Sequence, residues 1–255
     1  MTEMMRFISQ NAIIKGYVGD SIVLGKSVIG AGTIIEENVI IGHPIEKTIR
    51  SLIDSGIFNL KKIDDASRGA RIGRRCIIRS GTVIYEDTII GNHVRTGHNV
   101  LIREGSIIGE GSLIGTGVVL DGSVKIGKYV KIQSNAYLPH LTEIGDNVFI
   151  APNVCFTNDP YPQSENLIGV KVEEEAIICA NATLLPGVHV GKRAVVAAGS
   201  VVTKNVPAGS VVLGNPARFC MTREEFDEKR RRWRSAKYLI RETIRLKRGN
   251  HVDQP

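Results

Sequence analysis

A period of six residues runs through most of this chain of 255 residues and limits what it can fold into. In blocks of six counted from Ile72, the first residue is apolar in every block through Phe156 except at Thr96. The fifth residue of each block, from Cys76 to Val154, is small or β-branched. An amphipathic α-helix repeats its apolar residues every three to four positions, and a half-buried strand does so at every second position. The period of six fits neither, and it predicts short strands joined by corners.

Three such blocks make a triangular coil that sends one aliphatic side chain inward from each side. Glycine, which permits sharp bends of the backbone, often follows the inward aliphatic residue. These glycines are at positions 73, 91, 97, 109, 115, 127 and 145. Aromatic residues make up only 5% of the chain, so the core has to be narrow and built from branched aliphatic side chains. We therefore predict an all-β chain folded as a left-handed parallel β-helix, a solenoid in which each coil stacks on its neighbours.

Two interruptions of the period predict loops inserted into the β-helix. The upstream aliphatic positions in the same phase are Val23, Ile29, Ile35 and Ile41. The period then breaks over residues 43–69, and it breaks again over 157–171. After the second break the period of six resumes, shifted by two residues, at Val172, Ile178, Leu184, Val190, Val196 and Val202. Because loops that leave a solenoid can carry chemistry or subunit contacts, we expect functional roles for both insertions, within a β-helix that spans residues 1–220.

Beyond residue 220 the period changes to that of a helix. Thr222 and Glu225 have the spacing of a capping box, and Met221 and Phe226 that of a hydrophobic staple. One face of the predicted helical extension, residues 221–255, carries Phe226, Trp233, Ala236, Ile240 and Ile244. We expect it to pack on the β-helix or on a neighbouring subunit. A helix that binds a membrane surface or a nucleic acid is the alternative, because a basic amphipathic helix also has that use.

The distribution of charge argues against nucleic acid as the partner. The formal net charge is +7, but residues 222–250 hold eleven Lys or Arg against five Asp or Glu, which is +6. The remainder of the chain is therefore close to neutral. No apolar stretch approaches the roughly 20 residues of a membrane span, and the N-terminus lacks the apolar run of a secretory signal. We expect a cytoplasmic protein with no membrane span.

The C-terminal repeats resemble a known family. The run 'CANATLLPGVHVGKRAVVAAGSVVTKNVPAGSVVLGNPAR' is similar to the acetyl-CoA-binding coils of the hexapeptide-repeat acyltransferase superfamily and ends in its 'GNPA' motif. The resemblance implies acetyl-CoA as co-substrate and a homotrimer with active sites in clefts between adjacent subunits. Small residues let an extended amide chain approach the backbone, and Lys and Arg bind phosphates. The cofactor-binding residues implied are Ala180, Ala198, Gly199, Lys204, Asn215, Pro216 and Arg218.

The second interruption of the six-residue period indicates which substrate accepts the acetyl group. The loop 'FTNDPYP', residues 156–162, resembles that of enzymes that N-acetylate amino sugars carried on dTDP or UDP. The resemblance implies that Asn158 and Asp159 contact the sugar in a catalytic role, with Asp159 accepting a hydrogen bond from the sugar amine. The further substrate-binding residues it implies are Gln133, Asn135 and Tyr161. The alternative for Asn and Asp beside Pro is a turn held by local side-chain hydrogen bonds.

The histidines leave two other enzyme classes open. Relatives that acetylate hydroxyls carry a catalytic histidine in the region of this loop, which has none here, and a hydroxyl needs a positioned base more than an amine does. His98 is our candidate general base across a trimer cleft, an exposed or interface histidine being its alternative, and His140 is a weaker candidate. His93 and His98 resemble the paired ligands of γ-class carbonic anhydrases, but a zinc site needs a third histidine and the neighbouring coils supply none. We expect no metal.

The function predicted from the sequence is transfer of an acetyl group from acetyl-CoA to the amine of a nucleotide-linked amino sugar, in the biosynthesis of a surface polysaccharide. An O-acetyltransferase that acts on a sugar or small-molecule hydroxyl is the first alternative. A metalloenzyme like γ-class carbonic anhydrase and a noncatalytic scaffold on the same fold are the others.

Overall fold

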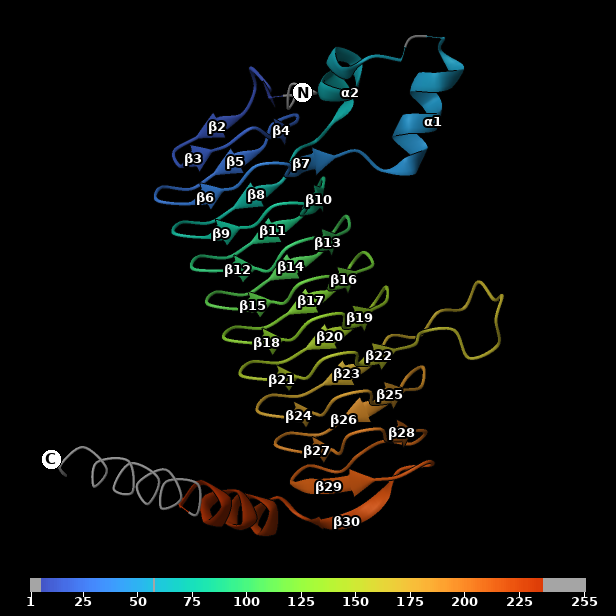
Figure 1. Ribbon diagram of the computed structural model, residues 1–255. Coiled ribbons are helices and arrows are strands. Elements are labelled where there is room, and N and C mark those ends of the chain that lie inside the picture. The colour runs from blue at the N-terminus through green and yellow to red at the C-terminus, as the bar shows by residue number, and fades with distance from the viewer. Residues whose placement is uncertain (1–5, 57, 236–255) are drawn as a thin grey trace, which may run out of the picture.

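The computed structural model describes residues 6–56 and 58–235 of the chain. Its strands wind into a left-handed parallel β-helix with three flat sides (Figure 1). Successive strands belong to different sides, and strands of successive coils pair in parallel within one side. The predicted fold class is therefore confirmed.

Each side of the solenoid is one long sheet of very short strands. Sheet A holds β1 (Phe7–Ile8), β4 (Ile22–Val23), β7 (Ile40–His43), β10 (Val83–Tyr85), β13 (Leu101–Ile102), β16 (Val119–Leu120), β19 (Tyr137–Leu138), β22 (Cys155–Phe156), β25 (Thr183–Leu184) and β28 (Val201–Val202). Sheet B holds β2 (Ile13–Ile14), β5 (Val28–Ile29), β8 (Arg71–Ile72), β11 (Ile89–Ile90), β14 (Ile107–Ile108), β17 (Lys125–Ile126), β20 (Glu143–Ile144), β23 (Lys171–Val172) and β26 (His189–Val190). Sheet C holds β3 (Tyr17–Val18), β6 (Ile34–Ile35), β9 (Ile77–Ile78), β12 (Arg95–Thr96), β15 (Leu113–Ile114), β18 (Lys131–Ile132), β21 (Phe149–Ile150), β24 (Ile177–Ile178), β27 (Val195–Val196), β29 (Ser210–Leu213) and β30 (Arg218–Thr222).

The core is the stack of inward side chains that the six-residue period predicts. From β3 onward, the second residue of each two-residue strand is buried, as at Ile102 and Leu120, which are partners in adjacent coils. Thr96, the polar exception, is also buried, and its Oγ1 accepts a hydrogen bond of 2.9 Å from the backbone N–H of Arg79. The hydroxyl is therefore satisfied inside the core.

The three corners are named here after the sheets they join. In one coil the BC corner is residues 73–76, the CA corner 79–82 and the AB corner 86–88. Many corner residues have positive φ, which Gly and Asn tolerate best. At the CA corner, for example, Asn99 has φ 54° and Gly117 in the next coil has φ 66°. The turns of the solenoid thus account for part of the Gly and Asn content of the repeat.

The solenoid begins earlier than the period indicates. Strands β1 to β3 form one more coil, in which Phe7 pairs with Ile22, a spacing of 15 positions instead of the regular 18. The inward residues of this coil do not keep the period of six, so the sequence pattern did not reveal it.

The first insertion is helical, not a loop as the interruption of the period led us to expect. It contains α1 (Glu46–Asp54) and α2 (Leu60–Ala66), and Asn59 caps α2 by accepting a hydrogen bond from the Lys62 N–H. Two buried carboxylates hold the insertion to the coils. Asp64 accepts from the Gly25 N–H at 2.8 Å, and Glu86 accepts from the N–H groups of Ile45 and Arg68 at 3.1 and 2.8 Å.

The second insertion is an extended loop between β22 and β23. Both insertions follow a strand of sheet A, so both leave the solenoid at the AB corner, on the right of Figure 1.

The C-terminal part closes the end of the solenoid. Strands β29 and β30 pair in antiparallel fashion, and a helix over residues 223–235 follows. The predicted capping box is confirmed: the Thr222 N–H donates to Glu225 Oε2 at 2.7 Å, and the Glu225 N–H donates to Thr222 Oγ1 at 3.3 Å. The rest of the predicted extension, including Ala236, Ile240 and Ile244, lies outside the described residues. Among the helices that the structure describes, none is both long and apolar enough to span a membrane.

Candidate active site

The structure brings three of the predicted cofactor-binding residues into one line along the CA corner. Ala180 and the pair Ala198–Gly199 occupy adjacent coils, and the Gly199 N–H donates to the Ala180 carbonyl at 2.9 Å. Ala198 and Gly199 are exposed. A Cβ added to Gly199 would have no neighbour within 4 Å, so the backbone here faces open space. The corner is thus accessible to an extended ligand.

The predicted 'GNPA' segment continues this line at the end of the solenoid. The Gly214 N–H donates to Ser200 Oγ at 3.1 Å, the Val201 N–H donates to the Gly214 carbonyl, and the Ala217 N–H donates to the Val201 carbonyl. These bonds fix the segment on the coil that carries Ala198. They leave Asn215 and Pro216 exposed beside the same corner.

Two predicted phosphate-binding cations line the same pocket at the C-terminal end of the solenoid. Lys204 and Arg218 line one pocket of about 280 Å³, and both are exposed. They come from opposite sides of the last coil, Lys204 after β28 and Arg218 at the start of β30. The pocket can accommodate a phosphate group between two positive charges.

Three predicted acceptor residues lie farther toward the N-terminus on the CA corner. Gln133 and Asn135 belong to one coil and exposed His98 to another. His98 is four coils from Ala180, roughly 19 Å at the usual spacing of paired strands. Asn135 also has a structural role. It adopts φ 59°, and a Cβ on Gly117 would lie 2.5 Å from its Oδ1, so its side chain rests on that glycine.

The loop residues lie on the other edge of sheet A. Asn158 donates from Nδ2 to the His140 carbonyl at 3.2 Å. The Asp159 carboxylate accepts from the N–H groups of Tyr161 and Ser164 at 3.1 and 2.9 Å, and from Ser164 Oγ at 2.8 Å. The Ser164 N–H is the main reason why the pKa of Asp159 is below its ordinary value. In this structure Asp159 therefore braces the loop, as the turn alternative describes.

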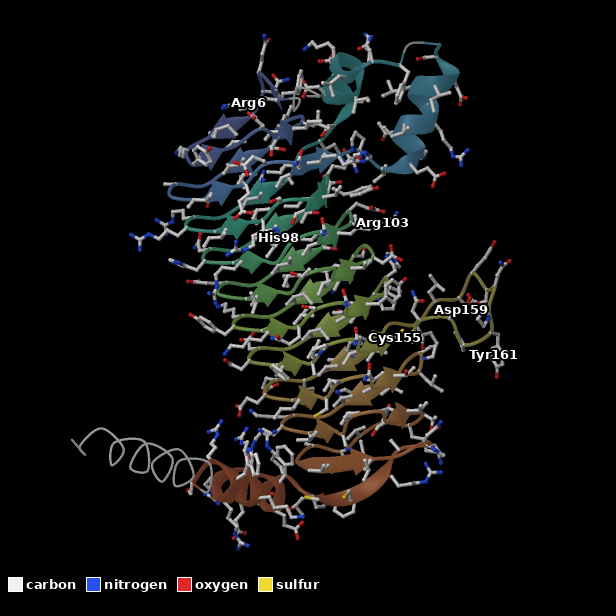
Figure 2. The ribbon with its side chains drawn as sticks, in the orientation of Figure 1. Arg6, His98, Arg103, Cys155, Asp159 and Tyr161 are labelled. Atoms are coloured by element: carbon white, nitrogen blue, oxygen red, sulfur yellow. The ribbon has the colours of Figure 1, made fainter. Side chains whose placement is uncertain are left out.

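The loop projects away from the solenoid, and 84% of Tyr161 is exposed (Figure 2). Because Asn158, Asp159 and Tyr161 follow sheet A while Gln133, Asn135 and His98 precede it, one chain does not bring the two groups together.

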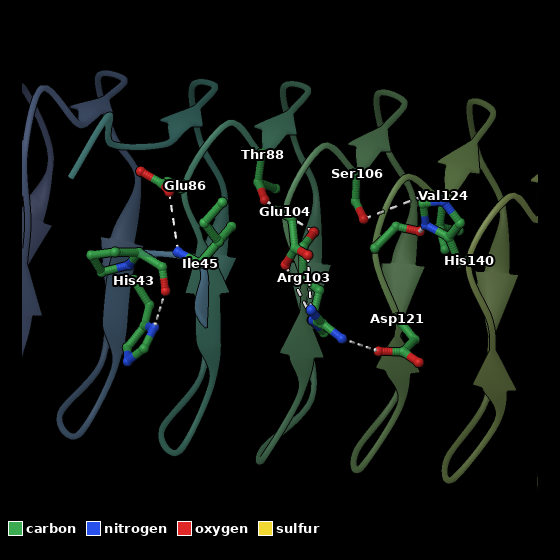
Figure 3. A network of polar contacts seen from close by, with 12 residues as sticks. His43, Ile45, Glu86, Thr88, Arg103, Glu104, Ser106, Asp121, Val124 and His140 are labelled. Carbon is green, nitrogen blue, oxygen red and sulfur yellow. Dashed lines mark hydrogen bonds and ion pairs between the residues drawn. The ribbon is translucent and has the colours of Figure 1, made fainter. Parts of the chain in front are cut away.

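A polar network that the sequence analysis missed lies on sheet A and its AB edge (Figure 3). Arg103 donates to both oxygens of Glu104 at 3.1 and 2.8 Å and to Asp121 at 3.0 Å. The Tyr137 hydroxyl donates to the other oxygen of Asp121 at 2.8 Å, and the Tyr85 ring centroid is 5.8 Å from the Arg103 guanidinium. Two carboxylates and one guanidinium give this network a net charge of −1. Tyr85, Arg103 and Asp121 are 18 residues apart in sequence, and that spacing was the available signal.

Tyr137 is expected to ionise far above neutral pH. Partial burial, and then the hydrogen bond to Asp121, raises the pKa of Tyr137 to about 12. A raised pKa stabilises the fold below the ordinary value of about 10, and this stabilisation is lost as the pH rises from about 10 to about 12. The absorbance titration of wild type minus that of Tyr137→Phe should show one phenol ionising at about pH 12. A difference transition near pH 10 in folded protein would contradict the contact with Asp121.

The histidine pair of the carbonic anhydrase alternative is not assembled. His93 turns at the BC corner and His98 at the CA corner. Within residues 6–56 and 58–235, no three His, Cys, Asp or Glu side chains are arranged to hold a metal ion.

Comparison with known proteins agrees with the repeat. The family model for the bacterial transferase hexapeptide (six repeats) matches residues 87–122, 105–140, 123–158 and 169–204. "Putative acetyltransferase YvoF" of Bacillus subtilis is 38% identical over 111 residues, which cover 42% of this chain and 64% of that protein. A 2,3,4,5-tetrahydropyridine-2,6-dicarboxylate N-acetyltransferase of Staphylococcus aureus is 45% identical over 74 residues, 29% of this chain and 30% of that protein. The chain thus spans less than two thirds of either curated relative.

A solved structure resembles most of the chain in fold. LpxA from Acinetobacter baumannii superposes with a TM-score of 0.51 at 19% identity, over 89% of this chain and 76% of that one. At this identity the likeness is one of fold. The matched repeats within residues 87–204 and the coil geometry together show that the chain carries the bacterial transferase hexapeptide repeat.

Proposed function

We propose that the protein transfers an acetyl group from acetyl-CoA to the amine of a nucleotide-linked amino sugar. The observation that carries the proposal is the accessible CA corner, where Ala180, Ala198 and Gly199 continue into the 'GNPA' segment and end at the pocket of Lys204 and Arg218. This line offers backbone hydrogen bonds to an amide chain and positive charge to phosphates. The names of the two curated relatives, both acetyltransferases, support it.

An amine is favoured over a hydroxyl as the acceptor for two reasons. The network of Arg103, Glu104 and Asp121 carries one net negative charge on the face of sheet A, which attracts an ammonium group. The loop after β22 holds no histidine to serve as the base that a hydroxyl requires.

The reaction needs little from the side chains once both substrates are held in place. The bound ammonium group first loses a proton to solvent, and the neutral amine then attacks the thioester carbon, so that a C–N bond forms and the C–S bond breaks. The proton leaving the nitrogen neutralises the departing thiolate, and a backbone N–H at the corner stabilises the oxyanion. Asn158 orients the sugar in this proposal, and Asp159 acts through the conformation of the loop or by contact with the amine.

A homotrimer would complete the site. In one chain the CA corner and the loop lie on opposite edges of sheet A. We propose that the cleft between two subunits places the loop of one copy against the CA corner of its neighbour. His98 would then face the cleft as a base.

The proposal is tested by measuring thiol release from acetyl-CoA with a panel of dTDP- and UDP-linked amino sugars and their hydroxyl counterparts. Release with the amino sugars alone is the expected result. Release with hydroxyl acceptors alone would instead identify an O-acetyltransferase, and no release with any acceptor would favour a noncatalytic role.

Two substitutions of Asp159 separate its possible roles. Asp159→Ala removes all three loop hydrogen bonds and is expected to lower kcat/KM for the amino sugar by about 10- to 100-fold, while the KM for acetyl-CoA stays constant. Asp159→Asn keeps an acceptor oxygen for the loop but loses the charge, so recovery of most activity would identify a loop brace. Glu165→Ala is the control, because it removes an exposed carboxylate from the same loop. Unchanged turnover in Asp159→Ala would remove Asp159 from the site.

A further inference from the structure

A second hollow, separate from the CA corner, lies between the C-terminal helix and the body of the solenoid. Its volume is about 920 Å³, and its walls are the helix over residues 223–235 on one side and sheet C with the adjoining BC corner on the other. Besides Arg223, three aromatic rings and three further cations dominate its lining. They are Tyr129, Phe149, Phe226, Lys131, Arg230 and Arg234.

The groove is held open by a buried anchor at the start of the helix. Arg223 is buried, and its guanidinium donates to the carbonyls of Arg193 and Glu175 at 2.6 and 3.2 Å. Asp227, one turn later, accepts from Arg223 Nε at 3.1 Å. Arg193 reaches Glu224 on the same helix at 3.3 Å. The helix is thereby fixed to two adjacent coils, so the groove exists before any ligand arrives.

The charges on its two walls have the same sign. Lys131 extends from sheet C and Arg234 from the helix, and neither has a carboxylate within ion-pair distance among the residues the structure describes. Arg230 has a partner, Asp227, at 2.9 Å. Glu175 is the one acidic residue of the lining, and it is exposed. An anion between Lys131 and Arg234 would relieve the repulsion between the walls.

The aromatic residues offer flat surfaces beside these cations. Tyr129 is 56% exposed, and its backbone has φ 55°, a conformation that bulky residues rarely adopt. Its ring lies over Gly111, where an added Cβ would come within 2.5 Å of the ring. The glycine leaves room for the ring, and the positive φ is the one that this corner position also has in other coils, as at Asn147.

We propose that this groove binds a nucleoside phosphate, with the base against the rings of Tyr129, Phe149 and Phe226 and the phosphate between Lys131 and Arg234. Stacking on aromatic rings and phosphate binding by cations are the two interactions that such a ligand needs. The groove is on sheet C, and the strand that carries Lys131 leads directly to Gln133 at the CA corner. The nucleotide could therefore be part of a substrate of the proposed reaction or a separate effector, and binding itself does not depend on the proposed function.

The test is calorimetric titration of the full-length protein with UDP, dTDP, ADP and inorganic phosphate. We expect saturable binding of at least one nucleotide and at least tenfold weaker binding of phosphate. Lys131→Glu and Arg234→Glu should each weaken nucleotide binding by at least tenfold. Arg95→Glu is the matched control, because Arg95 has the same outward position on sheet C two coils away, and it should change binding by less than twofold.

The results of the titration distinguish the possible nucleotides from one another and show whether the proposal fails. Strongest binding of UDP or dTDP assigns the groove to the acceptor or an effector of that class, and strongest binding of ADP assigns it to an adenine nucleotide. No saturable binding, equal binding of phosphate, or insensitivity to both Lys131→Glu and Arg234→Glu would overturn the proposal. A change of oligomeric state in Lys131→Glu without nucleotide binding by wild type would show that a second copy covers the groove, which also overturns it. Binding without any acetyl transfer would refute the proposed function and leave this one standing.

Discussion

Ala198→Trp is expected to lower kcat/KM for acetyl-CoA by about 100-fold, because displacing a bound substrate by as little as 1 Å has an effect of this size. Ala198 is exposed at the CA corner, next to Gly199, whose backbone faces open space. An indole there would cover the line from Ala180 to the 'GNPA' segment. Since the change lies on the surface, the free energy of unfolding should stay within about 0.5 kcal/mol of wild type.

The chain supplies its own control for this experiment. Ala208 and Gly209 form the same turn at the BC corner: Ala208 is exposed, Gly209 has φ 67° as Gly199 has, and both glycines face open space. Ala208→Trp therefore adds the same bulk to the same local structure on a different edge. Steady-state kinetics should find it within twofold of wild type. Equal losses in both variants would show that bulk disturbs the fold, and no loss in either would remove the CA corner from the acetyl-CoA site.

The repetitive part of the fold was predictable because one physical rule governs it. A single inward side chain per strand has to be apolar in every coil, so columns such as Ile102 and Leu120 appear directly in the sequence. The period does not extend into the first coil, because β1 and β2 pair with the next coil at a spacing of 15 and β3 at a spacing of 17, while its inward residue Val18 stays buried. A period of six identifies coils of regular length and does not identify irregular ones.

The helices of the first insertion had weaker signals. Asn59 is an N-cap residue that reasoning from capping could have identified. Helix α1, however, has no buried residue, so its sequence is not constrained by the core in the way that the strands are. What fixes the insertion is a pair of buried carboxylates, Asp64 and Glu86, whose backbone N–H partners lie 39 residues from Asp64 and 41 and 18 residues from Glu86. Contacts at such separations cannot be read from local pattern.

At the candidate site, residues that follow the repeat could be predicted from the sequence, and contacts between side chains could not. Small residues at the CA corner follow the repeat. The register of the coils is therefore enough to predict that Ala180 and Gly199 lie next to each other. The bracing of Asp159 depends on Ser164, and the Arg103 network depends on stacking of adjacent coils. Identifying that network required comparing residues 18 apart for charge as well as for hydrophobicity.

Phe156→Ala is expected to lower the free energy of unfolding by about 3–5 kcal/mol, the usual cost of removing a buried phenyl ring. Phe156 is fully buried and is the largest inward side chain of the solenoid core, in a column where its neighbours in adjacent coils are Leu138 and Leu184. It lies directly before the second inserted loop. The cavity left by alanine would therefore open at the base of the loop that carries Asn158, and acceptor turnover should fall together with stability.

Cys155→Ala provides the comparison for this loss of stability, since Cys155 is the other residue of β22 and points outward, half-buried. Removing its sulfur should cost less than about 1 kcal/mol. Denaturant unfolding of both variants at one protein concentration measures the difference, because association would otherwise shift the apparent stability. If Phe156→Ala costs no more than Cys155→Ala, the inward column does not carry the stability assigned to it here. If only Phe156→Ala loses acceptor turnover while retaining acetyl-CoA binding, the loop takes its position from the core beneath it.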